Sequence, residues 1–123
     1  MNGNRLVLDT NIVLYLLNGE QTISEFLEGQ QGYVCVVTEL ELIGYPDIED
    51  AELDQIKAFL ATCSIVDIND DIRGIYTTLR RRYRLKLGDA AAAATALYLG
   101  LPFMSADKGF NKVEELQLML YTP

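Results

Sequence analysis

Short apolar runs rich in β-branched residues alternate along this chain with longer segments in which apolar side chains recur at helical spacing. The runs predict strands at Leu6–Leu8, Tyr33–Val37, Ser64–Ile68, Pro102–Ser105 and Leu116–Leu120. Helices are expected to begin near Ile12, Ile23, Thr38, Ala51, Asp71 and Ala90. This alternation predicts one α/β domain over residues 1–123, with a central, mostly parallel sheet of about four or five strands flanked by helices on both faces.

The chain of 123 residues contains no histidine, and this absence excludes much enzyme chemistry. No imidazole is present to act as a general base, and no Ser-His or Cys-His nucleophile pair exists. The two cysteines, Cys35 and Cys63, lie in apolar runs and are expected to be buried free thiols, with a disulfide as the less usual alternative. An enzyme of this composition has to rely on carboxylates and hard cations.

The apolar stretches, such as Ile12–Leu17 and Ala90–Leu99, are shorter than the roughly 20 residues of a membrane span. The N-terminus lacks the long apolar segment and small-residue cleavage site of a signal peptide. A cytoplasmic protein without membrane contact is therefore expected.

Four acidic residues occupy related positions in the expected fold. Asp9 directly follows the first strand, and Asp107 comes soon after the strand that ends at Ser105. Glu41 falls in the first turn of the helix expected from Thr38, and Asp89 opens the alanine-rich helix. Because ligands of open parallel sheets bind beyond the carboxyl ends of the strands, these carboxylates are expected to meet at one edge of the sheet.

Carboxylates that gather in one place repel one another by roughly 4 kcal/mol per pair at ~4 Å and an effective dielectric constant of about 20. A cation removes this repulsion, and Mg²⁺ and Mn²⁺ prefer carboxylate and water ligands. Such an ion polarises a phosphodiester and activates water without any histidine. The acidic positions therefore predict a Mg²⁺ or Mn²⁺ site suited to phosphodiester hydrolysis.

The segments that carry these acids also resemble, in order, the four motifs of PIN-domain ribonucleases, particularly the VapC toxins of bacterial toxin–antitoxin pairs. The segments are Leu8-Asp9-Thr10-Asn11-Ile12, residues 38–46 (TELELIGYP), residues 85–97 (LKLGDAAAAATAL) and residues 105–110 (SADKGF). Together they span the chain from Leu6 to about Leu120. Two positions depart from the usual VapC pattern: Gly88 replaces a common proline, and Gly109 replaces a common acid or histidine.

The resemblance implies a PIN-like fold and a metal-dependent endoribonuclease that hydrolyses RNA as the toxin of a toxin–antitoxin pair. It assigns metal binding and catalysis to Asp9, Glu41, Asp89 and Asp107. Thr10, Asn11 and Ser105 are expected to orient these ligands. A homodimer and a VapB-like antitoxin that inserts a segment into the site are implied as well. Helices Ile12–Leu17 and Ala51–Ala61 are candidate interface surfaces.

The net charge of −8 argues against a nucleic-acid partner, but the basic residues are unevenly distributed. Half of the ten Lys and Arg residues lie within seven positions: Arg80, Arg81, Arg82, Arg84 and Lys86. This run is either a solvated helix face or a binding surface for the RNA backbone. Its place just before Asp89 favours the second interpretation.

Three of the four acids also have a structural alternative. Asp9 and Asp89 suit helix N-caps, and Thr38-x-x-Glu41 is a capping-box pattern. The functional alternative is a non-catalytic Mg²⁺-binding module, either an inactive PIN-like protein or a receiver-like domain that uses Asp9 with Asp67 or Asp70. Receiver domains carry paired acids after the first strand, whereas Thr10 and Asn11 follow Asp9 here. The sequence therefore favours the nuclease.

Overall fold

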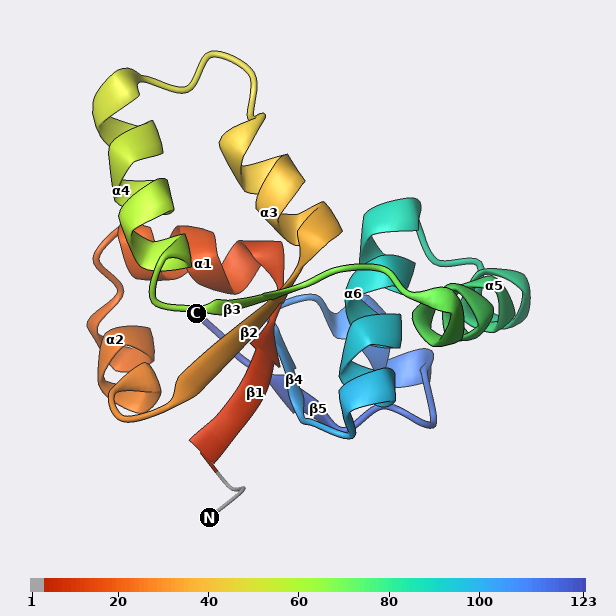
Figure 1. Cartoon of the computed structure of the whole chain (residues 1–123). Helices are drawn as coiled ribbons and strands as arrows, with labels where there is room; N and C mark the ends of the chain where they lie inside the picture. Colours follow the sequence, from red (N-terminus) through yellow and green to blue (C-terminus); the bar gives the residue numbers. More distant parts are fainter. Residues whose placement is uncertain (1–3) are drawn as a thin grey trace.

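The computed structural model describes residues 4–123 and arranges all of its strands in one parallel sheet (Figure 1). The strands are β1 (Arg5–Leu8), β2 (Gln31–Cys35), β3 (Ser64–Val66), β4 (Phe103–Ser105) and β5 (Leu118–Leu120). Their order in the sheet is β3-β2-β1-β4-β5, and each neighbouring pair runs parallel. The predicted α/β class and parallel sheet are confirmed.

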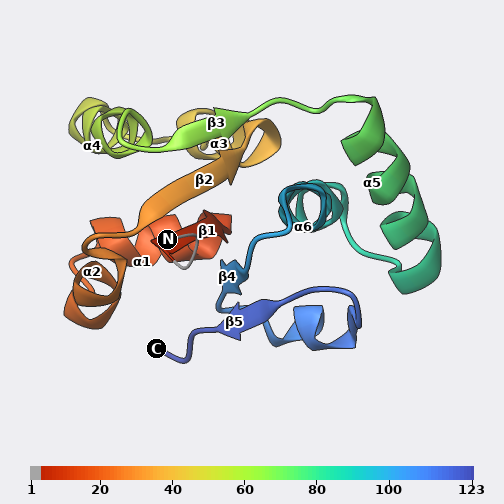
Figure 2. The ribbon, with the colours of Figure 1, turned by 60° about the horizontal axis from the view of Figure 1, so that its bottom comes forward.

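Helices cover both faces of this sheet, as expected. They are α1 (Thr10–Leu17), α2 (Gln21–Leu27), α3 (Val36–Ile43), α4 (Asp50–Leu60), α5 (Asp70–Tyr83) and α6 (Leu87–Leu99), followed by a short 3-10 helix, Lys108–Lys112. Figure 2 shows α1, α2 and α4 on one side of the sheet and α5 and α6 on the other.

The core divides into two clusters because successive strand residues point to opposite faces. In β1, Val7 packs with the α5–α6 side, while Leu6 and Leu8 pack with α1, α2 and α4. Residues 90–94 of α6 are all alanines and are all buried. Their small side chains allow α6 to lie close to the sheet.

Two boundaries differ from the sequence-based expectation. Val36 and Val37, expected in the second strand, begin α3 instead, because the chain passes from β2 into the helix with no intervening loop. Thr38 is then the third residue of α3 and is 1% exposed, so the capping-box interpretation of Thr38 and Glu41 is wrong. Asp89 lies in the first turn of α6, with Lys86 as the N-cap, so the N-cap interpretation of Asp89 is wrong.

Cys35 is buried and Cys63 is half-buried, and neither forms a disulfide. Across residues 4–123, none of the helices has the length and apolar character needed to cross a membrane.

Candidate functional site

Asp9 is the buried centre of the site, at the end of β1. Its side chain is the N-cap of α1, and one carboxylate oxygen accepts a 2.8 Å hydrogen bond from the Thr10 backbone N–H. The other oxygen accepts bonds from Ser105 Oγ at 2.7 Å and from Asn11 Nδ2 at 3.3 Å. The predicted helix cap is therefore present. The same carboxylate also belongs to a hydrogen-bond network that joins the ends of β1 and β4.

This network fixes the turn that follows β4 against the start of α1. Asn11 Oδ1 accepts a 3.0 Å bond from the Ala106 N–H, and Asn11 Nδ2 lies 3.3 Å from Ser105 Oγ. Ser105 Oγ also accepts a 3.0 Å bond from the Asp107 N–H. Asn11 and Ser105 thus hold the backbone of Asp107 beside Asp9.

Burial makes the charge on Asp9 unfavourable. The residue is 6% exposed, and the pKa of its carboxyl is raised from 3.8 to about 6, with loss of contact with water as the largest of several causes. Bonds from Ser105 and Thr10 lower this pKa, whereas the negative charges of Asp89 and Asp107 raise it further. The charges of two acids from distant parts of the chain therefore act on Asp9.

Glu41 projects from α3 toward Thr10, the residue that follows Asp9. Its Oε1 atom accepts a 3.1 Å hydrogen bond from Thr10 Oγ1. Glu39, two residues earlier, instead lines a separate cavity with Lys57 and Cys63. Only one of the two glutamates thus faces the site, and it is the one that the motif selected.

Asp89 projects from the first turn of α6 and is half-buried. Desolvation raises the pKa of its carboxyl, and the negative charges of Asp107 and Glu41 raise it further. Lys86 and Lys112 lower it. The helix N-terminus also favours a negative charge at this position.

Asp107 is exposed and caps the short 3-10 helix, where its Oδ1 accepts a 2.8 Å bond from the Gly109 N–H. A Cβ at position 109 would come within 3.0 Å of the same Oδ1. Gly109 therefore leaves room for the carboxylate to fold back onto its own turn.

The other three acids therefore lie near Asp9. The four side chains do not yet form a complete set of ligands around one ion. Among residues 4–123, no three Cys, Asp or Glu side chains stand in positions that would hold one metal ion. The donors are nevertheless all hard oxygens, and the pKa values of Asp9 and Asp89 record their mutual repulsion. Glu41 and Asp107 are exposed, so each can turn toward the two more buried aspartates once its bond to Thr10 or Gly109 breaks. The residue set fits a divalent cation on these grounds.

Gly88 allows Glu41 to lie against α6. A Cβ at position 88 would meet Glu41 Oε2 at 2.6 Å, too close for any unmoved side chain. Only the flexible end of Glu41 would have to shift. The departure from the usual proline therefore affects the position of the second acid as well as the start of the helix.

We expect Gly88→Ala to weaken Mn²⁺ binding about tenfold, in the range seen when partners of metal ligands are lost. Folding stability should stay equal or rise by about 0.5–1 kcal/mol, because alanine is favoured over glycine in helices. Gly74→Ala in α5 is the matched control, since a Cβ there meets nothing within 4 Å. Calorimetric Mn²⁺ titration and thermal unfolding measure both effects. Unchanged Mn²⁺ affinity in Gly88→Ala would show that the position of Glu41 does not matter to the ion.

The basic run separates into two groups in the structure. Arg84 and Lys86 line a cavity of about 160 Å³ together with Asp89 and Asp107. Arg82 instead pairs with Glu115 at 3.1 Å, and Arg80 lies over the ring of Tyr76. Arg80, Arg81 and Arg82 are not part of the cavity lining.

Lys112 completes the lining of this cavity and was missed at the sequence level. It is the last residue of the 3-10 helix and stands alone in the sequence, outside the basic run. Its one signal is its position five residues after Asp107.

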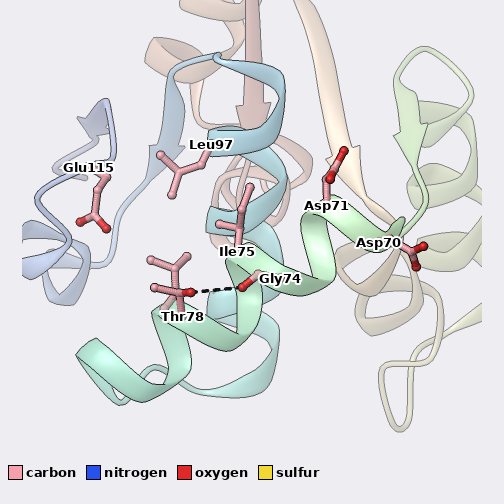
Figure 3. Close-up of a pocket in the computed structure, with 8 residues that line it drawn as sticks. Asp70, Asp71, Gly74, Ile75, Thr78, Leu97 and Glu115 are labelled. Carbon is pink, nitrogen blue, oxygen red and sulfur yellow. Dashed lines mark hydrogen bonds between the residues drawn. The ribbon is translucent and has the colours of Figure 1, made fainter.

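A cavity of about 550 Å³ lies against α5, and its lining includes none of the four acids (Figure 3). Its lining includes Asp70, Asp71 and Glu115 around Ile75 and Leu97, and it contains no basic residue. Asp67, proposed with Asp70 in the receiver-like alternative, is not among the acids whose charge affects Asp9. The observed grouping therefore supports Asp9 with Asp89 and Asp107 over the receiver arrangement.

Comparison with known proteins identifies the family and the fold. The family model for the PIN domain matches residues 6–116. A toxin–antitoxin complex from Klebsiella pneumoniae is similar in structure, with 27% identity, 90% of this chain and 94% of that chain covered, and a TM-score of 0.78.

VapBC2 from Rickettsia felis, bound to a promoter DNA fragment, is 18% identical over 94% of this chain and 98% of its own, with a TM-score of 0.84. VapBC-1 from nontypeable Haemophilus influenzae is 23% identical over 97% of this chain and 99% of its own, with a TM-score of 0.76. These two likenesses show a shared fold. No curated protein matches the chain significantly.

Proposed function

Because this chain belongs to the PIN domain family, we propose that it is a Mg²⁺- or Mn²⁺-dependent endoribonuclease and the toxin of a toxin–antitoxin pair. The observation that carries this proposal is the buried carboxylate of Asp9. It accepts hydrogen bonds from Ser105 and Asn11, and the negative charges of Asp89 and Asp107 raise its pKa. A purely structural cap has no need of two further acids nearby, since they make its own charge more unfavourable.

The four acids have different tasks in this proposal. Asp9 and Asp89 form the fixed part, because one is buried in a network and the other stands on the first turn of α6. Glu41 and Asp107 are exposed and complete the ligand set by rotation. A bound divalent cation supplies positive charge that polarises the phosphodiester and activates a water molecule for attack. The chain contributes no imidazole to this chemistry.

Thr10, Asn11 and Ser105 act on the ligands as orienting residues. Thr10 donates to Glu41, while Ser105 and Asn11 donate to Asp9. The bond from Ser105 lowers the pKa of Asp9 and so favours its ionised form, the form that a metal requires. Arg84 and Lys86, on the rim of the same site, position the RNA backbone by charge.

The similar structures include toxin–antitoxin complexes, which supports a VapB-like antitoxin as the partner of this chain. A basic side chain on an inserted antitoxin segment would meet the acidic site with complementary charge.

A homodimer is also proposed, on a surface different from the one that the sequence suggested. Ile12, Val13, Ile56 and Leu60 of the two candidate helices are buried in the core of the chain itself. The exposed apolar side chains Leu40 and Leu87, 56% and 55% exposed, are available to a second copy.

The proposed function is tested by cleavage of a structured RNA by protein freed of antitoxin. We expect cleavage with Mn²⁺, loss of cleavage in excess chelator, and recovery when Mn²⁺ is restored. Antitoxin added in equal amount should inhibit the reaction. Cleavage that persists in chelator would reject the metal-dependent mechanism, and a complete absence of cleavage with Mn²⁺ or Mg²⁺ would reject the nuclease in favour of a PIN-like binding protein.

A further inference from the structure

A small cavity beside the acids combines three basic side chains from two separate segments. Arg84 and Lys86 come from the connection between α5 and α6, and Lys112 comes from the end of the 3-10 helix. Asp89 and Asp107 complete the charged part of the lining. At about 160 Å³, the cavity is well below the roughly 300–1,000 Å³ that drug-sized ligands occupy. It suits one compact anionic group.

Among residues 4–123, none of these three cations forms an ion pair within 4.0 Å. The ion pairs found within 4.0 Å in the described part of the chain are Arg73–Asp70 and Arg82–Glu115. Lys86 and Lys112 both act on Asp89, whose pKa they lower, so their charges reach the acidic centre. If a divalent cation neutralises the carboxylates, the positive charge of the cavity remains unbalanced.

The two walls of the cavity are fixed in place. Arg84 adopts the left-handed conformation at the end of α5, with φ of 56°, and the next residue, Leu85, is buried. On the opposite wall, the buried side chains of Phe110 and Val113 anchor the segment that carries Lys112.

A clamp joins these walls. The Tyr83 hydroxyl donates to Glu115 Oε1, and Arg82 Nη1 donates to Glu115 Oε2 at 3.1 Å. The clamp explains why Arg82, although part of the basic run, is turned away from the cavity.

A second cavity beside α6 has a lining different from that of the basic cavity. The face of α6 that carries Leu87 and Ala91 lines a different cavity, together with Val37, Ile68, Arg73 and Tyr76. Arg73 is the one cation there, and it pairs with Asp70 at 3.8 Å. Cations without an ion-pair partner in the described residues are therefore concentrated in the basic cavity, whereas the lining of the cavity beside Leu87 and Ala91 is mainly apolar.

We propose that Arg84, Lys86 and Lys112 form a subsite for one backbone phosphate of RNA, next to the scissile phosphodiester and on one side of it. This inference rests on the proposed nuclease function and adds Lys112 to the RNA contacts expected from the sequence. Phosphate binding by clustered Lys and Arg is the main source of affinity for nucleic acids. The subsite fixes the direction in which the strand enters the metal site.

The test measures binding of a fluorescent single-stranded RNA, with Ca²⁺ in place of Mn²⁺. We expect Arg84→Gln and Lys112→Gln each to weaken binding on the order of tenfold, and the double variant to reduce the salt slope by about 0.7 per lost phosphate contact. Arg81→Gln removes the same charge from an exposed position outside the cavity and is the matched control. If Arg81→Gln weakens binding as much as the two cavity variants do, the subsite does not exist.

A second measurement tests the position of the phosphate. Mn²⁺-dependent cleavage is compared for RNAs with a neutral methylphosphonate on either side of the mapped cleavage point. The subsite predicts slower cleavage for one side only, and no further slowing by that methylphosphonate in the double variant. Equal effects from both sides would overturn the proposal. Failure of the nuclease function is distinguishable, because it abolishes cleavage by the unmodified protein while the binding comparison still decides whether the subsite exists.

Discussion

Asp9→Asn is expected to abolish RNA cleavage and, in chelator at pH 7.5, to make the protein more stable. The loss of activity should be at least about a thousandfold, because a metal ligand supports several kcal/mol of transition-state stabilisation. The gain in stability follows from the buried charge. Because the pKa of Asp9 is about 6 in place of 3.8, ionisation at pH 7.5 costs the folded state about 3 kcal/mol.

An amide at position 9 removes this charge but loses part of the bonding with Ser105 and Asn11, which is worth about 1–2 kcal/mol. The net gain should therefore be about 1–2 kcal/mol, measured by denaturant unfolding. Asp54→Asn, an exposed change in α4, is the control and should affect neither quantity. A variant that is both inactive and strongly destabilised would mean that Asp9 is a structural cap, and a variant that cuts RNA normally would remove Asp9 from the catalytic machinery.

The second large effect is a stabilisation by Mn²⁺ that depends on pH. At about 100 times its dissociation constant, the ion should add about 2.7 kcal/mol to the free energy of unfolding. For a domain of this size, that corresponds to roughly 10 °C in Tm. The effect should be large at pH 7.5 and small at pH 5, where protons compete for the carboxylates.

Without divalent cations, the pH dependence has a definite sign. Because the pKa of Asp9 is about 6 in the folded state and 3.8 for an ordinary aspartate, the folded protein binds the proton more tightly. The stability contribution of this group is greatest below about pH 4 and is lost as the pH rises through 6. The raised pKa of Asp89 acts in the same direction. Thermal unfolding in chelator and in Mn²⁺ between pH 4.5 and 8 measures both trends. A Tm that rises with pH in chelator but not in Asp9→Asn would contradict the assignment.

The sequence predicted well those features that depend on local pattern. Alternating apolar runs placed the strands, and position after a strand was enough to select Asp9 and Asp107. Parallel pairing of β1 with β4 then brings the ends of these strands together. The choice of Glu41 over Glu39 came from the family motif, and the structure shows the two side chains in different surroundings.

What the sequence did not predict depends on contacts between distant residues. The basic run gave no sign that Arg82 would pair with Glu115, which lies 33 residues away. Lys112 joins Arg84 and Lys86 only because the 3-10 helix packs beside the connection between α5 and α6. The start of α3 at Val36 was also missed, because two consecutive valines favour a strand and packing decided otherwise.

The central claim is that Asp9, Glu41, Asp89 and Asp107 together bind a divalent cation. The most direct measurement is anomalous diffraction at the manganese edge from crystals of the full chain grown with Mn²⁺ at pH 7.5. The account predicts an anomalous peak among the four carboxylates, with oxygen ligands at about 2.0–2.6 Å and with the Glu41 and Asp107 side chains turned toward Asp9 and Asp89. A structure at saturating Mn²⁺ with no peak there, or with the ion held elsewhere, would contradict it.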